Sequence, residues 1–291
     1  MRPLRYAPLS REQWPQIFAT FREAFADYAI PVSGPQEQVF LNRMIKNGID
    51  FGASAGAFDG ERLVGFSLTG LDVWDGVPAA FDACTGIVPG YRGFGVAPAI
   101  FELMIAGLRA RGVRRFLLEV LRDNRPAVGT YRKLGFRVTR EFDCLQLPLE
   151  RARPAAPPRV DDLVVEPVGR ELLPRLAPFA DWRPSWENTL SAIARIPDAV
   201  TVLGARRGGR WVGFAVHYPG LNWIQGIAVD PAERRRGIAG ALLARLLADL
   251  AGRVPAVKIV NVDPADAASA AWLAAAGFEV YARQLEMELM L

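Results

Sequence analysis

The chain has 291 residues, of which 51% are hydrophobic and 23% charged, and this composition excludes a disordered protein. Its formal charge of +4 is a small excess of basic residues for a nucleic-acid-binding protein, and binding of small anionic ligands explains it equally well. The two cysteines, Cys84 and Cys144, lie in apolar, strand-like segments, which favours buried free thiols in a reducing compartment over a disulfide framework.

The amino terminus lacks the apolar core of a signal peptide, and no apolar stretch approaches the roughly 20 residues of a membrane helix. We therefore expect a soluble, cytoplasmic monomer or homodimer with neither a membrane nor a nucleic-acid partner. The only histidine, His217, lies in a strand-like segment and is predicted to be a hydrogen-bonded strand residue. Since no Cys or His cluster accompanies it, we expect no metal.

The first half of the chain predicts an alternation of helices and strands. Apolar spacing predicts helices over 14–25, 98–109 and 124–134, with glycines or prolines at their ends. Apolar runs predict strands over 51–58, 63–71, 81–88, 116–121 and 136–147, the first two forming a hairpin. An initial hairpin followed by alternating strands and helices indicates an α+β fold with a mixed, mainly antiparallel sheet flanked by helices.

An internal repeat sets the domain organisation. Arg92, Gly95, Ala97 and the pair Gly135-Phe136 recur 142 residues later as Arg234, Gly237, Ala239 and Gly277-Phe278. The second half repeats the order with a helix over 240–250, a strand over 257–262 and a helix before Gly277. The chain therefore predicts two copies of one domain, over 1–150 and 160–291, joined by the proline-rich linker 151–159.

Each copy contains a strand that passes through a glycine-containing turn into a helix. Such a turn presents unpaired backbone N–H groups and the positive end of the helix dipole to one point, where a phosphate binds well. Gly93 and Gly95 permit the backbone conformations and the close approach that this requires. Taken alone, the turn also fits an ordinary strand–helix connection, and the arginines over 234–236 fit a solvated charge run.

Three segments carry a resemblance to a known family. VPGYRGFGVA (88–97) and VDPAERRRGIAG (229–240) resemble the acyl-CoA pyrophosphate loop of the GNAT superfamily of N-acyltransferases. NRPAVGTYRKLGF (124–136) resembles the next motif of that family, with Asn124, Tyr131 and Gly135-Phe136 in the expected places. The resemblance covers both halves, so the chain looks like a tandem GNAT protein.

The resemblance implies that acetyl-CoA, or another acyl-CoA, is the co-substrate. The turn residues would hold its pyrophosphate, and the preceding strand would pair with its pantetheine arm. In the first copy the implied residues are Gly86, Ile87, Val88, Arg92, Gly93, Phe94, Gly95, Val96, Ala97, Asn124 and Tyr131. In the second they are Ala228, Val229, Arg234, Arg235, Arg236, Gly237, Ile238, Ala239 and Gly240.

The resemblance also implies a reaction and an acid for it. Tyr131 would protonate the departing thiolate of CoA, although a core aromatic on an amphipathic helix would look the same. Glu119, a carboxylate in an otherwise apolar strand, is the candidate base or a structural carboxylate, with Asp82 as a weaker alternative base. The resemblance places the acceptor pocket near Asp27 and Tyr28, and we include Asp82 among the residues expected to line it.

The second copy keeps the turn but loses these groups. At the 142-residue offset, Tyr131 becomes Leu273, Asn124 becomes Asp266 and Glu119 becomes Asn261. We therefore predict that the first domain transfers an acetyl group to a primary amine of a small molecule and that the second is catalytically degenerate. The alternative is a protein that binds or senses acyl-CoA without turnover. The sequence does not identify the amine.

Overall fold

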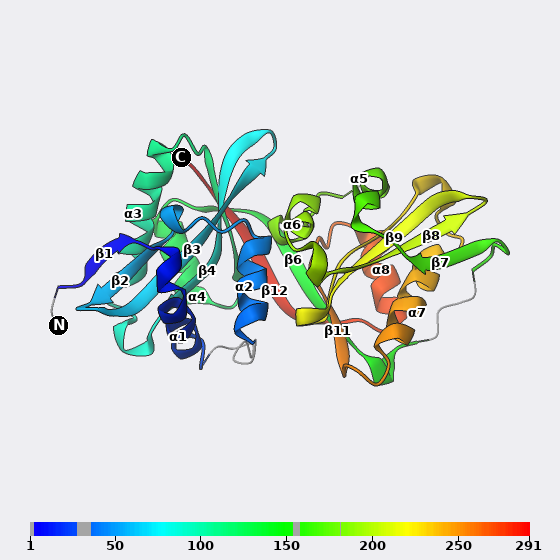
Figure 1. The fold of residues 1–291 in the computed structure, drawn as a ribbon, viewed down its shortest axis with the longest axis horizontal. Helices are drawn as coiled ribbons and strands as arrows, with labels where there is room; N and C mark the ends of the chain where they lie inside the picture. Colours follow the sequence, from blue (N-terminus) through cyan, green and yellow to red (C-terminus); the bar gives the residue numbers. More distant parts are fainter. Residues whose placement is uncertain (1–2, 28–35, 154–157, 181) are drawn as a thin grey trace. The chain divides into compact units, whose positions relative to one another are not determined.

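The computed structural model describes residues 3–27, 36–153, 158–180 and 182–291 (Figure 1). They form two compact units, one comprising Met1–Arg140 with Leu285–Leu291 and the other Glu141–Gln284. Each unit is a mixed sheet flanked by helices, so the α+β prediction is confirmed. Among the described helices, none combines the length and the apolarity that crossing a bilayer demands.

The first unit has the sheet order β1-β2-β3-β4-β5-β12, in which β4 and β5 are parallel. Its strands are β1 (Arg5–Pro8), β2 (Ala55–Asp59), β3 (Arg62–Trp74), β4 (Val77–Ile87), β5 (Arg115–Leu121) and the end of β12 (Glu279–Met290). Its helices are α1 (Trp14–Ala24), α2 (Glu37–Lys46), α3 (Val96–Ala110) and α4 (Arg125–Lys133).

Glycines in the strands of the first unit bring α1 and α3 close to opposite faces of the sheet. A Cβ added to Gly65 would meet Val96 and Ile100 of α3. A Cβ added to Gly86 would meet Phe25 and Ala24, at the end of α1. Both helices therefore pack tightly on the strand pair β3–β4, which leads into the loop before α3.

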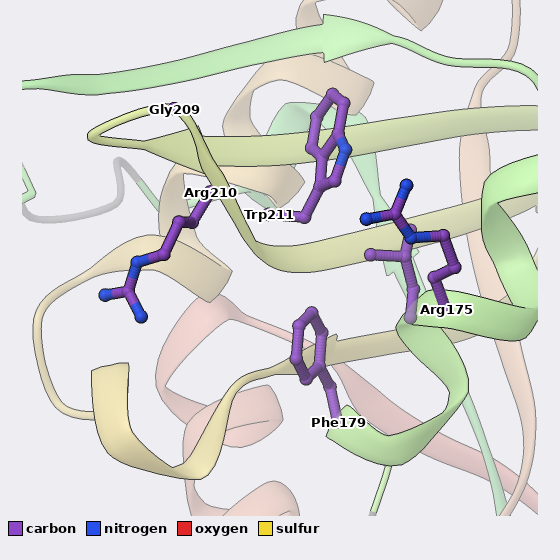
Figure 2. Close-up of a pocket in the computed structure, with 6 residues that line it drawn as sticks. Arg175, Phe179, Gly209, Arg210 and Trp211 are labelled. Carbon is purple, nitrogen blue, oxygen red and sulfur yellow. The ribbon is translucent and has the colours of Figure 1, made fainter.

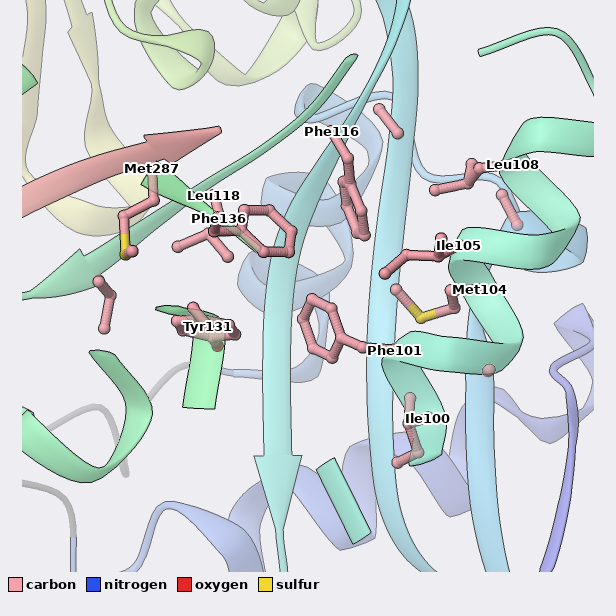
Figure 3. Close-up of a cluster of buried hydrophobic side chains, with 14 of the residues drawn as sticks. Ile100, Phe101, Met104, Ile105, Leu108, Phe116, Leu118, Tyr131, Phe136 and Met287 are labelled. Carbon is pink, nitrogen blue, oxygen red and sulfur yellow. The ribbon is translucent and has the colours of Figure 1, made fainter. Parts of the chain in front are cut away.

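The core on the α3 face is a cluster of aromatic rings and aliphatic side chains (Figure 3). Phe101 of α3 lies 5.3 Å from the ring of Tyr131 on α4, and Phe136 lies 5.9 Å from the same ring. Met287, from the far end of the chain, is fully buried in this cluster. The C-terminal strand therefore supplies part of the first unit's core.

The second unit has the order β6-β11-β10-β9-β8-β7. Its strands are the later part of β6 (Arg137–Pro148), β7 (Leu163–Pro167), β8 (Thr201–Arg207), β9 (Arg210–Tyr218), β10 (Trp223–Val229) and β11 (Ala256–Val262). Its helices are α5 (Leu173–Leu176), α6 (Leu190–Ala194), α7 (Ile238–Leu250) and α8 (Ala267–Ala276).

The division of the chain differs from the predicted boundaries at 150 and 160. Residues of β6 from Glu141 onward belong to the second unit, where Leu145 pairs with Ile259. The last seven residues, Leu285–Leu291, belong to the first unit, and the N–H of Leu291 donates to the carbonyl of Arg114, after α3 (Figure 1). Both copies follow their Gly-Phe pair with a similar strand, so local pattern does not reveal which sheet receives it. Residues 154–157 of the predicted linker lie outside the described part of the chain.

Several local predictions also change. Residues Phe51–Ala53 form a 3₁₀ turn rather than a strand, because the Asp50 carboxylate accepts from the N–H of Ala53 at 2.8 Å. Helix α2 was not predicted. His217 lies on β9 as predicted, but its buried Nε2 has no hydrogen-bond partner among the described residues, and burial lowers its pKa to about 4. Neither cysteine forms a disulfide; Cys144 is buried and Cys84 half-buried.

Candidate active site

The candidate site of the first unit begins with residues 91–97, which we call the first glycine loop. Gly93 and Gly95 have φ angles of +81° and +77°, in the region where L side chains are strained. Both glycines are exposed, and a Cβ on either would meet only open space. Helix α3 begins directly after Gly95, so its first N–H groups lack intrahelical acceptors. The loop is therefore an open N–H cradle suited to an anion.

The side chain of Arg92 ties this loop to α1. Its guanidinium donates to Asp27 at 2.7 Å and to the carbonyl of Ala24 at 2.7 Å, and its Nε donates to the carbonyl of Ile87 at 3.1 Å. The hydrogen bond from Arg92 lowers the pKa of Asp27. The described contacts of Asp27 are thus with the loop, and its place in an acceptor pocket stays a prediction. Tyr28 lies outside the described residues.

The strands β4 and β5 separate beside the loop. Their parallel pairing runs from Ala79 with Arg115 to Asp82 with Leu118 and then ends, although β4 continues to Ile87. The N–H of Val88 donates to Val64 on β3, so the predicted contact of Val88 with the cofactor lacks that donor. Because successive N–H groups of a strand point to opposite sides, the N–H of Ile87 points away from β3, into the gap. This arrangement leaves a strand edge, including Gly86 and Ile87, suited to an extended amide chain.

The side chains of Tyr131 and Asp82 contact each other next to this gap. The Tyr131 hydroxyl donates to Oδ2 of Asp82 at 3.4 Å, and both residues are buried. Asp82 also accepts from Thr85 at 2.8 Å and from Ser67 at 3.0 Å. Burial raises the pKa of Asp82 to about 6, against the opposing effect of these hydroxyl groups. From its place in the sequence Asp82 is a weaker candidate base than Glu119, and its contact with Tyr131, 49 residues away, is visible only in the structure.

Glu119 points away from this pair. It follows Leu118, which packs in the same cluster as Tyr131, and alternation along β5 therefore sends Glu119 to the opposite face of the sheet. The structure does not bring the two predicted catalytic groups together on one face. The role of Glu119 as a base stays a prediction.

Asn124 has a structural role that the sequence analysis missed. Its side chain accepts from the N–H of Ala127 at 3.3 Å and caps α4. In the second unit Asp266 caps α8 in the same way, accepting from Ser269 at 3.1 Å. Asparagine and aspartate are both good N-caps, so this change between the copies preserves the helix start. Its predicted contact with the cofactor stays a prediction.

The second unit repeats the loop geometry over residues 233–239, the second glycine loop. Arg234 donates to the carbonyl of Val229 at 3.1 Å and to that of Phe179 at 3.1 Å, as Arg92 does to Ile87 and Ala24. Gly237 has a φ of +83° directly before α7. The predicted cofactor residues Ile238, Ala239 and Gly240 form the first turn of α7, and Ala228 and Val229 end β10.

Arg235 occupies the position of Gly93 and adopts a φ of +64°, which is unfavourable for a residue with a Cβ. Replacing Arg235 by glycine is therefore expected to stabilise the second unit by about 1 kcal/mol. Urea unfolding measures this change. Arg236→Gly is the matched control, because Arg236 is absent from the positive-φ residues; it should not stabilise the protein. Equal stabilities of the Arg235→Gly variant and the parent would contradict the strain.

The second unit lacks the Tyr131–Asp82 pair. At the same offset stand Leu273 and Ile224, both buried in its apolar core. Asn261, the counterpart of Glu119, adopts a φ of +60° and donates to the hydroxyl of Ser185 at 3.0 Å. No hydroxyl or carboxyl group therefore replaces the pair at these positions.

A groove of about 440 Å³ adjoins the second glycine loop (Figure 2). The rings of Trp211 and Phe179 border it, with the guanidinium groups of Arg175 and Arg210 on either side. Arg210 also lies 3.6 Å from Glu233 of the loop. The groove combines apolar rings with positive charge at the edge of the loop.

The sequence profile of the acetyltransferase (GNAT) family matches two segments of the chain, residues 14–136 and 170–278. The chain belongs to the GNAT family. The matched segments lie one in each half, and each contains a glycine loop. The chain is thus a tandem GNAT protein, as the resemblance implied.

Solved structures share the whole tandem architecture. A tandem GNAT protein from the clavulanic acid biosynthesis pathway superimposes with a TM-score of 0.77 over 99% of this chain and 98% of that one, at 19% identity. A GCN5-related N-acetyltransferase from Sphaerobacter thermophilus gives 0.71 over 99% of this chain and 95% of that one, at 17% identity. At these identities the likeness shows the fold alone.

Curated relatives match over a shorter stretch. Mycothiol acetyltransferase of Corynebacterium glutamicum is 38% identical over 82 residues, which cover 28% of this chain and 27% of that protein. N-alpha-acetyltransferase 30 of Schizosaccharomyces pombe is 32% identical over 81 residues, 28% of this chain and 54% of that protein. The matched stretch thus spans about a quarter to a half of these relatives.

Proposed function

We propose that the first unit transfers the acetyl group of acetyl-CoA to a primary amine of a small molecule, by direct attack in a ternary complex. The observation that carries this proposal is the arrangement of three features around one gap: the first glycine loop, the free edge of β4 and the hydroxyl of Tyr131. The family supplies the co-substrate class. The relatives named mycothiol acetyltransferase and N-alpha-acetyltransferase 30 differ in the acceptor that their names indicate, so the proposal names no particular amine.

Each feature has one task in this proposal. The N–H groups of the first glycine loop bind the pyrophosphate, where the dipole of α3 favours negative charge. The edge of β4 at Gly86 and Ile87 pairs with the amides of the pantetheine arm. This places the thioester beside the gap, where the N–H of Ile87 hydrogen-bonds the carbonyl oxygen as it gains negative charge.

The chemical step then needs one bond made and one broken. The amine nitrogen attacks the carbonyl carbon, the C–N bond forms and the C–S bond breaks. Tyr131 gives its hydroxyl proton to the departing sulfur, because a thiol is a far better leaving group than a thiolate would be in a buried site. The amine loses its own proton to water or to a carboxylate.

Gly95 tests the co-substrate site. Gly95→Val introduces a β-branched side chain at a φ of +77° and at the point where a phosphate must approach. We expect calorimetric titration with acetyl-CoA to show at least about tenfold weaker binding at the first unit, a loss of about 1.4 kcal/mol. Gly90→Val is the matched control, since Gly90 is also exposed, also has open space around its Cβ, and has no positive φ. Equal binding by both variants would refute the loop as the phosphate site.

For the second unit we propose binding without catalysis. Its loop retains the arginine that donates to two backbone carbonyls and the glycine with a positive φ, while Leu273 and Ile224 replace the Tyr131–Asp82 pair. The second glycine loop should therefore contribute a second acetyl-CoA site in the same titration. A stoichiometry of one per chain in the parent protein would remove this proposal and leave the first intact.

A further inference from the structure

Asp82 is a buried carboxyl group with a defined set of partners. Only 7% of the residue is exposed. Its two oxygens accept from the hydroxyl groups of Thr85, Ser67 and Tyr131, at 2.8, 3.0 and 3.4 Å. Three hydroxyl groups around one carboxyl group form a built network rather than a surface contact. The proposed function uses only one of them, that of Tyr131.

The surroundings of Asp82 are neutral. The groups that face it or adjoin it are Ser67 and Thr69 from β3, Thr85 and the backbone N–H of Cys84 from its own strand, Leu118 from β5 and Tyr131 from α4. Tyr131 is the titratable group of this set. Because none of these described neighbours carries a positive charge that would favour the ionised carboxylate, burial raises the pKa of Asp82 to about 6. A proton therefore resides on Asp82 at mildly acidic and neutral pH for part of the time.

The protonation state of Asp82 determines the direction of the Tyr131 hydroxyl. An ionised carboxylate only accepts, so the proton of Tyr131 points at Asp82 and away from any other acceptor. A protonated Asp82 has one O–H donor, and this donor can point at the oxygen of Tyr131. The proton of Tyr131 is then free to point at the departing sulfur.

We propose that Asp82 is a positioning residue that, when protonated, donates its proton to Tyr131 as Tyr131 protonates the sulfur of CoA. This inference rests on the proposed function of the first unit. In the step, the S–H bond forms as the Tyr131 O–H bond breaks, and a new Tyr131 O–H bond forms as the Asp82 O–H bond breaks. Asp82 is left ionised. Asp82 then regains a proton from water, which has taken up the proton that the amine released.

The test is the ratio of kcat between the parent and Asp82→Asn, measured by release of the CoA thiol at saturating amine from pH 5 to pH 9. The ratio cancels the titration of the amine itself. An asparagine can donate to Tyr131 but cannot give up the proton. We expect a ratio of about 10 to 100 at pH 5 that falls toward one above about pH 7, as the parent's Asp82 ionises. A ratio that stays constant with pH would show a merely structural role and overturn the proposal.

Thr85→Val provides a second, independent readout. This variant removes a hydrogen bond that favours the ionised carboxylate, so it should raise the pKa of Asp82. The kcat of Thr85→Val divided by that of the parent, with the same saturating amine, should therefore rise with pH over the interval in which the parent's Asp82 ionises. A ratio that does not change with pH would contradict the proposal even if Asp82→Asn folded poorly. Absence of acetyl transfer by the parent protein would instead refute the proposed function.

Discussion

Tyr131→Phe is expected to lower kcat by about 10² to 10³, because phenylalanine keeps the ring but removes the hydroxyl that serves as the acid in the proposed reaction. The ring packs against Phe101 and Phe136, and phenylalanine fills the same space. Binding of acetyl-CoA and the stability of the fold should therefore change little. Steady-state kinetics with acetyl-CoA and a saturating amine measures the effect, with calorimetry as the check on binding.

Tyr6→Phe is the matched control for this loss. Tyr6 lies on β1 of the same unit and packs against the same apolar cluster as Tyr131, but it has no part in the proposed site. We expect its kcat to stay within about twofold of the parent, as is usual for a change outside the site. Full activity of Tyr131→Phe would assign the proton donor to another group. A fall in both variants would point to a general effect on the fold.

Met287→Ala is expected to destabilise the first unit by about 2 to 5 kcal/mol. Met287 is fully buried against the residues that surround Tyr131, although it lies at the opposite end of the chain from them. Truncation leaves a cavity that the surrounding rings cannot fill without moving. Amide hydrogen exchange resolved by segment should show faster exchange in α3, α4 and β5.

Met290→Ala provides the comparison on the same strand. Met290 is 66% exposed, so its truncation should change the stability by less than about 0.5 kcal/mol. If both variants behaved alike, the end of β12 would not be part of the first unit's core. The comparison therefore tests, without an activity assay, whether the end of β12 belongs to the core of the first unit.

The sequence predicted the elements around the two glycine loops well, because glycine at a positive φ and an apolar helical face are local signals. It did not predict which sheet receives the final strands. The strands after Gly135-Phe136 and after Gly277-Phe278 carry similar apolar patterns, and only long-range pairing distinguishes them. Helix α2 was missed, although it is amphipathic and buries Phe40 and Met44 on one face.

The site was predicted unevenly for the same reason. Tyr131 and the loop residues belong to contiguous motifs, and a family resemblance finds such motifs. Asp82 joins Tyr131 through a hydrogen bond between residues 49 positions apart, and no local pattern indicates that contact. The hydrogen bonds by which Arg92 and Arg234 fix their loops also use carbonyl groups of segments that lie far away in the sequence. Glu119 was favoured because a carboxylate in an apolar strand stands out, yet strand alternation turns it to the other face.

The most direct test of the account compares acetyl transfer by Gly95→Val and Gly237→Val, each with a single glycine loop blocked. The assay follows release of the CoA thiol from acetyl-CoA in the presence of a panel of primary amines. We predict that Gly237→Val retains amine-dependent release near the parent rate and that Gly95→Val loses most of it. Retention by Gly95→Val together with loss by Gly237→Val would contradict the account and assign catalysis to the second unit.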